Sequence, residues 1–320
     1  MLISKIITTN ANYFITNGAK PGHNGCYHNP ETKVRMNSHW AITLLKAYEI
    51  TKESKYKKSA VKCLDYLCSK EARPFGFTFN CREGKDKCNG LIGQAWAIES
   101  LMQGYKVLKD RKYKELAEKV FKMHKFSGFW KKREIDGKIL SFDLTFNHQL
   151  WFAASGSLID RKLVINFMNN LERNTSIHKN GLIRHLIFPK FTIPANFIKT
   201  RKSIYNKEVG YHAFNLYAFA LLRKKFPMHK FWKSEKFRKI SDYAMSKEHF
   251  AIAETSKYGM QYNPSGIELA FFNKSTKLLK KQFKNHLDKK TLLMNMNTSD
   301  PDVLSSRIYE VTRLEYNKIF

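Results

Sequence analysis

The chain contains few cysteines, prolines and acidic residues for its length, and no long apolar run. Among its 320 residues there are 5 Cys, 8 Pro and only 27 Asp and Glu. An odd number of cysteines in a chain of this size argues against a disulfide framework and favours a reducing compartment. No stretch approaches the roughly 18 apolar residues that a membrane-spanning helix needs. The apolar N-terminal stretch holds Lys5 and no small-residue cleavage site, unlike a signal peptide, so we expect a cytoplasmic protein.

The acidic residues are outnumbered by 57 Lys and Arg, which gives a formal net charge of +30. This balance predicts acidic partners, although a compositionally biased genome would produce it without selection for binding. No helix-turn-helix, zinc-finger or RNA-recognition motif is present, so nucleic acid is not expected as a partner. The expected partner is an anionic oligosaccharide or polysaccharide, free or lipid-linked, and peripheral contact with the inner face of an anionic membrane is left open.

Apolar residues recur at three- and four-residue spacing in segment after segment, while the alternation of strands is nearly absent. This pattern predicts pairs of amphipathic helices. The first two pairs share Trp, Ala, Ile, Leu, Tyr and a closing Lys-Tyr, so the pair repeats at about fifty-some residues. Such a unit matches an all-α, α/α-toroid fold with five to six hairpins around a central funnel, in one domain over 1–320. The four clearest pairs are 41–48 with 60–68, 98–105 with 113–121, 150–158 with 164–171, and 214–222 with 237–244.

Two further helices are expected to complete the ring, one from Ile267 and one from Leu304, and the N-terminal segment would close it. An open solenoid of the same hairpins is the structural alternative. Long segments between pairs, 72–90 and 176–210, favour the ring, because loops of that size usually carry function. The second is interpreted as a lid or loop insertion, with its least helical part, 181–207, as an alternative strand pair.

Polar side chains gather where the first helix of each pair begins, in HNGCYHNPETKVRMNSHW, CNGLIGQAW, FDLTFNHQLW and VGYHAFNLY. The inner helices of a toroid begin at the same end of the ring, so these residues are expected to converge on one funnel. Aromatic rings stack on sugar C–H faces, and amide and imidazole groups hydrogen-bond sugar hydroxyls. The substrate-binding candidates are His23, His28, Arg35, Asn37, His39, Trp40, Asn89, Gln94, Trp96, Asn147, Gln149 and Asn215.

Each of these residues also has a structural interpretation, because Asn caps helices and a buried His or Tyr is often a satisfied core residue. Their recurrence in four hairpins favours a site. Neither the spacing of His23, Cys26 and His28 nor that of Cys81 and Cys88 matches a zinc pattern. Phosphate loops and dinucleotide fingerprints are absent, so we expect no metal and no cofactor.

Several long motifs resemble a family of bacterial and archaeal proteins from surface-glycan biosynthesis clusters, including archaeal protein-glycosylation clusters. The motifs are HNGCYHNPETKVRMNSHW, CNGLIGQAWAIES, SFDLTFNHQLWFAA, NGLIRH, GYHAFNLYAFALL, FWKSEKF, YNPSG and DPDVLSSRIYEVTRL, and they cover nearly the whole chain. FNHQLWFAASGSL is also similar to the Asn-His segment in the α/α toroid of heparinase II/III-like lyases. The resemblance implies work on a glycan or its lipid-linked or nucleotide-linked precursor, and it carries over no catalytic set.

The residues are compatible with three functions. The first is a uronate-directed lyase or epimerase, in which Asn147 and Arg35 bind the sugar carboxylate while His148, His212 or Tyr211 acts as base and acid. For this chemistry His148 is the first choice, because the ordinary pKa of histidine lies near neutrality. His39, Asn89, Gln94, Asp143, His148 and His212 are expected to line one pocket.

The second function is a glycoside hydrolase with two carboxylates across the funnel, drawn from Glu31, Glu99 and Asp143. The third is a noncatalytic glycan-binding or scaffold protein that uses the same funnel without turnover. Two facing carboxylates would favour the hydrolase, whereas a floor of His, Tyr, Asn and Arg would favour elimination or epimerisation. A funnel that side chains block would favour the scaffold.

Overall fold

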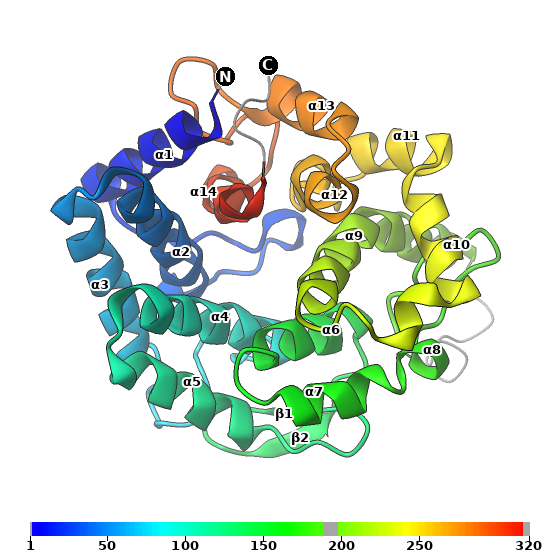
Figure 1. Ribbon diagram of the computed structural model, residues 1–320, viewed down its shortest axis with the longest axis horizontal. Helices are drawn as coiled ribbons and strands as arrows, with labels where there is room; N and C mark the ends of the chain where they lie inside the picture. Colours follow the sequence, from blue (N-terminus) through cyan, green and yellow to red (C-terminus); the bar gives the residue numbers. More distant parts are fainter. Residues whose placement is uncertain (1, 188–197, 316–320) are drawn as a thin grey trace.

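The structure is a computed structural model that describes residues 2–187 and 198–315. Helices dominate it and follow one another around a ring, with one layer facing the centre and one layer outside (Figure 1). Within the described ranges the sheet is a single antiparallel hairpin, β1 (Lys131–Arg133) with β2 (Ile139–Phe142). The all-α prediction is therefore confirmed.

The inner layer closes on itself. Each inner helix packs against the next, and the C-terminal turn η4 packs against both α2 and α12. This contact closes the ring and excludes the open solenoid, so the fold is the predicted α/α toroid. In chain order, the inner elements of the described residues are α2 (Lys33–Thr51), α4 (Gly90–Leu108), α6 (Phe146–Gly156), α9 (Ile198–Lys225), α12 (Ser265–Asn273) and α14 (Pro301–Ser306) with η4 (Arg307–Arg313).

The outer layer contains the second helix of each predicted pair. The N-terminal helix α1 packs against α2 and η4, so the two ends of the chain complete the ring together, as expected. In the described residues the outer elements are α1 (Ile3–Asn17), α3 (Ser54–Cys68), α5 (Arg111–Met123), α7 (Arg161–Met168), α8 (Leu171–Asn174), α10 (Glu235–Ala244), α11 (Lys247–Thr255) and α13 (Lys277–His286), with a short turn at η3 (Lys230–Lys233). The turn η1 (Gly25–Tyr27) lies in the connection between α1 and α2.

Inner and outer helices differ in how much of their surface is buried. Outer helix α5 buries Tyr113, Ala117 and Val120 on one side and presents charged residues on the other. Inner helix α4 is buried without interruption from Gly90 to Met102, because neighbouring elements surround it. A helix enclosed on all sides is expected to be apolar around its circumference, and each large apolar side chain that it buries contributes about 1.5–3 kcal/mol. Polar residues on inner helices therefore need a specific explanation.

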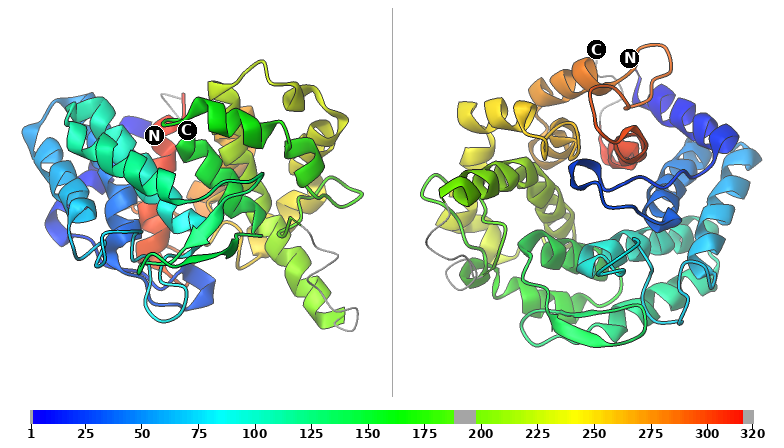
Figure 2. Two further views of the ribbon diagram at one scale, coloured as in Figure 1. Left: turned by 90° about the horizontal axis from the view of Figure 1, so that it is seen from below. Right: turned by 180° about the vertical axis from the view of Figure 1, so that it is seen from behind.

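The segment 176–210, predicted as a lid or loop insertion, contains both loop and helix. Residues 176–187 form a loop held by isolated bridges, residues 188–197 lie outside the described residues, and residues 198–210 belong to α9. The non-helical expectation for 198–207 was therefore wrong. The first turns of α9 extend beyond the ring (Figure 2, left), so they need no apolar period and rely on the helix propensity of Lys, Arg and Glu.

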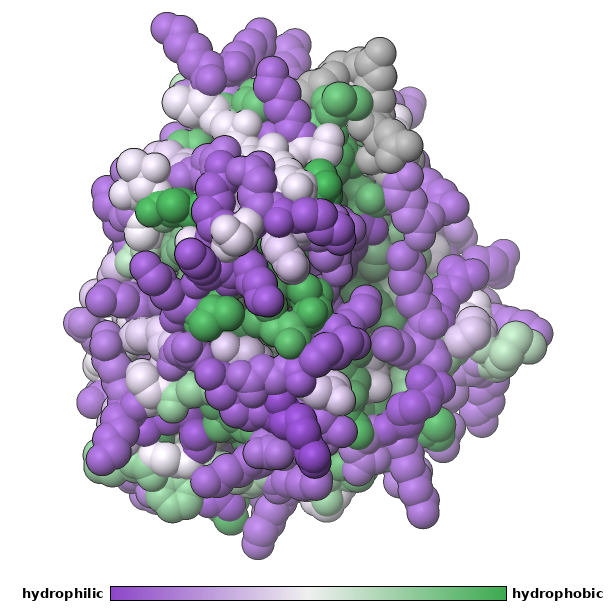
Figure 3. Space-filling model, turned by 60° about the vertical axis from the view of Figure 1, so that its left-hand side comes forward, coloured by the Kyte–Doolittle hydropathy of each residue, from purple (hydrophilic) through white to green (hydrophobic). Residues whose placement is uncertain are grey.

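Hydrophilic side chains cover most of the face shown in Figure 3, in agreement with lysines spread over the solvent faces of the helices. Among the described residues, no helix combines the length and the apolar character needed to cross a membrane. The connection between α1 and α2, residues 18–32, instead turns inward and extends over the centre of the ring (Figure 2, right). This segment forms part of the site described next.

Candidate functional site

A cavity of about 170 Å³ lies at the end of the ring where the inner helices begin. The first turns of α2, α4 and α6 supply part of its lining, and the middle of α9 supplies another part. The segment 18–32 covers it from one side. The lining residues are Asn24, Tyr27, Asn29, Arg35, Arg82, Asn89, Ile92, Trp96, Thr145, Asn147, His148, His185, Lys207, Tyr211, Phe214, Tyr262, Asn263 and Arg307.

The structure brings some of the predicted site residues together and places others elsewhere. Asp143 does not line the cavity but contacts His148 directly. Six predicted residues line the cavity, namely Arg35, Asn89, Trp96, Asn147, His148 and Tyr211. The remaining ones do not, namely His23, His28, Glu31, Asn37, His39, Trp40, Gln94, Glu99, Gln149, His212 and Asn215.

Three of the residues outside the cavity anchor the loops that precede inner helices. Gln94 receives a hydrogen bond from Phe79 N and donates to the Phe79 and Cys88 carbonyls. Gln149 likewise accepts a hydrogen bond from Trp130 N and donates one to the Trp130 carbonyl. The ring of His212 contacts the backbone of residues 183 and 240 through its two nitrogens. These side chains therefore satisfy buried backbone groups. The prediction that Gln94 and His212 line the pocket was wrong.

Other predicted residues are taken up by packing. His39 stacks on Tyr309, with ring centroids 4.3 Å apart, and its Nδ1 lies 3.0 Å from the Ser306 hydroxyl. Trp40 stacks on Phe14, and Asn37 donates to the carbonyl one turn earlier in its own helix. His23 and His28 stack on each other in the 18–32 segment, and Asn215 is buried in α9. None of these side chains lines the cavity.

The three candidate carboxylates for hydrolysis are all engaged with other groups. Glu31 accepts a hydrogen bond from Arg35 Nη1 at 3.0 Å, and Glu99 accepts one from Arg313 Nη2 at 2.6 Å. Burial raises the pKa of both glutamates. Asp143 accepts a hydrogen bond from the backbone N–H of Leu91. Within the described part of the chain, no Asp or Glu lines the cavity.

His148 and Asp143 form a hydrogen-bonded dyad at the cavity. His148 Nδ1 lies 2.8 Å from Asp143 Oδ2, which leaves Nε2 of the imidazole for a ligand. Burial alone would raise the pKa of Asp143, but the charge and hydrogen bond of His148, with the N–H of Leu91, lower it to about 2. The aspartate thus stays ionised near neutrality and orients the imidazole so that Nε2 can accept a proton.

Arg35 and Arg307 are the most deeply buried cations that line the cavity, and each side chain is 1% exposed. Its Nη1 pairs with Glu31, and the guanidinium carbon lies 4.4 Å from the ring centroid of Trp96. Its Nε and Nη2 have no hydrogen-bond partner among the described residues, although buried donors nearly always have one. In the part of the chain that the structure describes, three other cavity-lining side chains carry buried polar atoms without a partner: Trp96 Nε1, Asn147 Oδ1 and His185 Nδ1.

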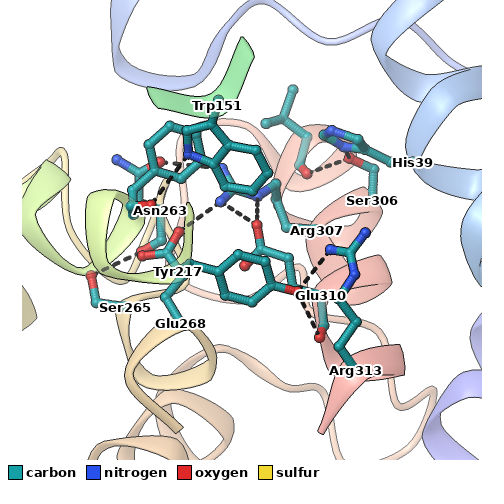
Figure 4. Close-up of polar contacts among 12 residues, drawn as sticks. His39, Trp151, Tyr217, Asn263, Ser265, Glu268, Ser306, Arg307, Glu310 and Arg313 are labelled. Atoms are coloured by element: carbon teal, nitrogen blue, oxygen red, sulfur yellow. Dashed lines mark hydrogen bonds and ion pairs between the residues drawn. The ribbon is translucent and has the colours of Figure 1, made fainter. Parts of the chain in front are cut away.

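Arg307 has the opposite character. Its guanidinium donates to Glu310, to Glu268 at 2.7 Å and to Asn263 at 3.2 Å, so its donors are committed (Figure 4). Burial, reinforced by the charge of Glu310, raises the pKa of Glu268. Trp151 stacks on Tyr217 beside this cluster, with ring centroids 5.6 Å apart (Figure 4). Behind the cavity, the axis of the ring is therefore filled by a paired polar core.

Sequence reasoning missed several residues that line the cavity. His185 and Lys207 come from the segment interpreted as a lid, and burial followed by the charge of Lys207 lowers the pKa of His185. Tyr27 lies in the first polar motif but was not selected, and its hydroxyl is 3.0 Å from that of Tyr211. Tyr262 and Arg307 lie in YNPSG and DPDVLSSRIYEVTRL, motifs that were recognised without assigning roles to their residues. Those motifs were the sequence signal that could have identified Tyr262 and Arg307 as site residues.

One group of side chains has the composition of a metal site. Ligand atoms of Asp86, Cys88 and Glu134 lie within 4.8 Å of one another. Arg82 pairs with Asp86, and one oxygen of Glu134 already accepts hydrogen bonds from two backbone N–H groups. Burial raises the pKa of the Cys88 thiol, which opposes the thiolate that a metal requires. The arrangement is satisfied without an ion.

Comparison with solved structures identifies the fold. The chain is similar to a sugar epimerase from a ruminal bacterium, at a TM-score of 0.66 and 11% identity over 97% of this chain and 98% of the other. It is also similar to cellobiose 2-epimerase from Spirochaeta thermophila, at 0.60 and 12% over 88% and 85%. An α-1,6-mannanase from Salegentibacter sp. HEL1_6 gives 0.57 and 11% over 97% of each chain. At these identities the likeness establishes the fold, an α/α toroid.

Sequence comparison gives the family. No family model matches the chain. The chain is 35% identical, over 349 aligned positions, to archaeal glycosylation protein Q of Haloferax volcanii, and the match covers 95% of this chain and 94% of the relative. The protein belongs to the family of archaeal glycosylation protein Q, as the resemblance of its motifs predicted.

Proposed function

We propose that this protein is an enzyme of glycan assembly that removes the proton next to the carboxylate of a uronic acid residue, as an epimerase or lyase does. The family relationship to a glycosylation protein and the toroid shared with sugar epimerases support a carbohydrate substrate. The choice of reaction rests on the cavity itself.

The observation that carries the proposal is that one cavity has both an arginine with unpaired donors and a histidine–aspartate dyad. Arg35 offers two unpaired buried donors, which match the two oxygens of a carboxylate. Binding the carboxylate there would withdraw charge and acidify the adjacent C5–H of the sugar. His148, oriented by Asp143, lines the same cavity and supplies the base.

The proposed step is balanced by groups in the cavity. His148 Nε2 takes the C5 proton, the electron pair of the C–H bond moves into the carboxylate, and Arg35 stabilises the resulting enolate. Return of a proton to C5 from the other face gives the epimer, and departure of the C4 substituent, whose oxygen takes up that proton instead, gives the unsaturated product. The candidate for returning the proton is the phenol of Tyr211, whose ring centroid lies 5.7 Å from that of His185.

The hydrolase alternative has less support from this geometry. It requires two carboxylates that flank a glycosidic bond, whereas Glu31 and Glu99 each pair with an arginine and Asp143 holds His148. A noncatalytic binding protein would share the unpaired donors of the cavity. The distinction between binding and turnover is therefore left to experiment.

The test follows deuterium from D2O into C5 of methyl hexuronides of glucuronate, galacturonate and mannuronate, with mass spectrometry and ultraviolet absorbance of unsaturated product as readouts. We expect incorporation by the wild type and a loss of about a hundredfold or more in His148→Gln. His229→Gln is the control, because His229 is bonded to Asn169 away from the cavity. Binding without exchange in the wild type would identify a noncatalytic protein, and full exchange in a folded His148→Gln would remove His148 from the mechanism.

A further inference from the structure

We infer that the cavity accepts a single sugar residue attached to its carrier at one point only, so that the protein acts on a chain end or an activated monosaccharide and not on residues inside a polymer. This inference rests on the proposed function and specifies its substrate class. Three observations carry it: the size of the cavity, the closed core behind it, and a wall of tyrosines beside it.

The first observation is size. Pockets that enclose drug-sized ligands measure about 300–1,000 Å³, whereas this cavity has about 170 Å³. A space of that volume is small for an oligosaccharide and suits the enclosure of about one six-membered ring with its substituents. The side chains of Arg35, Trp96 and Asn147, which carry buried polar atoms without a partner among the described residues, all line this one space.

The second observation is that buried side chains of residues 2–187 and 198–315 fill the ring behind the cavity. Arg307 lines the inner side of the cavity and is fixed by Glu268 and Glu310, both 0% exposed. Trp151 and Tyr217 are also fully or almost fully buried in this core. A polysaccharide therefore cannot thread through the toroid, and both ends of a bound chain would have to leave on the same side.

The third observation is a cluster of four tyrosines, Tyr27, Tyr211, Tyr258 and Tyr262, which we call the tyrosine wall. The hydroxyls of Tyr27 and Tyr211 are 3.0 Å apart, and this contact joins the 18–32 segment to α9. The ring of Tyr27 packs against those of Tyr258 and Tyr262, at centroid distances of 5.6 and 5.9 Å. A chain that continued through this side of the cavity would have to break these contacts.

The tyrosine wall is held in place by the polar core of the 18–32 segment. Asp300 accepts hydrogen bonds from the backbone N–H groups of His23 and Gly25, at 2.9 and 2.8 Å, and Tyr262 donates to Asn24 at 2.7 Å. Gly25 has a φ of +58°, and a Cβ there would lie 2.1 Å from the ring of Tyr262. The segment is thus fixed before any ligand binds.

A second hollow adjoins the cavity. Asn29 and Arg82 line both the cavity and this hollow, which lies over residues 82–86. The carrier of the bound sugar would leave through this hollow, past side chains that include Arg82 and Lys85. A residue with neighbours on both sides would need a further route out of the cavity, and the tyrosine wall occupies the side where the 18–32 segment meets α9.

The experiment uses a linear tri-hexuronate in D2O, with deuterium assigned to each of its three residues by tandem mass spectrometry. We expect label at one terminal residue, at least tenfold above the middle residue. Tyr27→Ala, which removes one side of the tyrosine wall, should raise labelling of the middle residue at least tenfold, whereas Tyr13→Ala on α1 should leave the pattern unchanged. Equal labelling of middle and terminal residues by the wild type would overturn the inference.

Binding gives a second measurement that does not depend on turnover or on a variant. Calorimetric titration should give methyl hexuronide and tri-hexuronate dissociation constants within about threefold of each other, because only one residue is enclosed. A gain of tenfold or more for the trimer would show further subsites and overturn the inference, while the proposed chemistry would stand. UDP-glucuronate as a third ligand distinguishes a nucleotide carrier from a glycan carrier, since both attach at one point. Failure of all three ligands to bind would instead contradict the proposed function.

Discussion

Two buried arginines, Arg35 and Arg307, line the same cavity but have opposite surroundings. Arg307 faces two glutamates and an asparagine that use its donors, whereas Arg35 uses Nη1 alone for Glu31 and Asn24 and has no partner for Nε and Nη2 among the described residues. A paired arginine fixes structure, and an unpaired buried one needs a ligand. The comparison separates a polar core that holds the ring together from a polar cavity that is incomplete without an anion.

The largest effect is expected when the paired core is broken. Arg307→Met leaves Glu268 and Glu310 buried without their cation, and removal of one partner from a buried ion pair costs about 3–5 kcal/mol. Urea denaturation should show a loss of that size in the free energy of unfolding. Arg111→Met, at a side chain 84% exposed, is the control and should change stability by less than about 0.5 kcal/mol. A loss below about 1 kcal/mol in Arg307→Met would contradict the assignment.

The next effect concerns the dyad on the cavity side. Asp143→Asn keeps the shape of the side chain but removes the charge that stabilises a protonated His148. We expect turnover in the C5 exchange assay to fall about a hundredfold. Binding of methyl hexuronide should change little, because Asp143 does not line the cavity. Unchanged turnover would show that the dyad does not supply the base.

The third prediction concerns a histidine buried in the core. His249 is 0% exposed, and burial, opposed in part by its bond to the Ala244 carbonyl, lowers its pKa to about 4. Because the folded-state pKa lies below the ordinary value of 6.5, the unfolded chain takes up the proton first, and stability is lost as the pH falls from 6.5 toward 4. Between pH 7 and 5 this group should cost about 2 kcal/mol. His249→Gln should flatten the pH profile of unfolding by that amount, and an unaltered profile would reject this origin.

The smallest effect is expected at Arg35, the arginine with unpaired donors. Arg35→Lys keeps a cation near Glu31 but loses the planar fork that matches a carboxylate. Binding of methyl hexuronide should weaken about tenfold, which corresponds to about 1.4 kcal/mol. Unfolding free energy should fall less than in Arg307→Lys, whose guanidinium serves three acceptor residues. Equal losses of stability in the two lysine variants would remove the distinction between the arginines.

The sequence was sufficient to predict the ring and the end at which polar residues gather, because apolar period and helix starts are local signals. It was not sufficient to predict which side of each helix start faces the cavity. Asn147 lines the cavity while Gln149 anchors a loop, since residues two apart on a helix point in different directions. Likewise Tyr211 lines the cavity and the adjacent His212 does not. The rotation of a helix about its axis depends on packing with neighbours that are distant in the chain.

Residues from irregular segments were harder still to predict. His185 lies in a loop that carries no helical period, yet Phe146 N bonds its carbonyl and brings it beside α6. Arg35 and Arg307 each have a glutamate within one helical turn in the sequence, Glu31 and Glu310, and only the folded arrangement shows that a second glutamate, Glu268, meets Arg307. This second pairing is a long-range contact, so the contrast between the two arginines emerges only from the structure.

The most direct test of the contrast between the two arginines is a crystal structure of the protein with methyl hexuronide. The account predicts the carboxylate within hydrogen-bond distance of Arg35 Nε and Nη2, with C5 of the sugar facing His148 Nε2 and the Arg307 ion pairs intact. A carboxylate bound to Arg307 in place of Glu268 or Glu310, or a sugar bound outside the cavity, would contradict it.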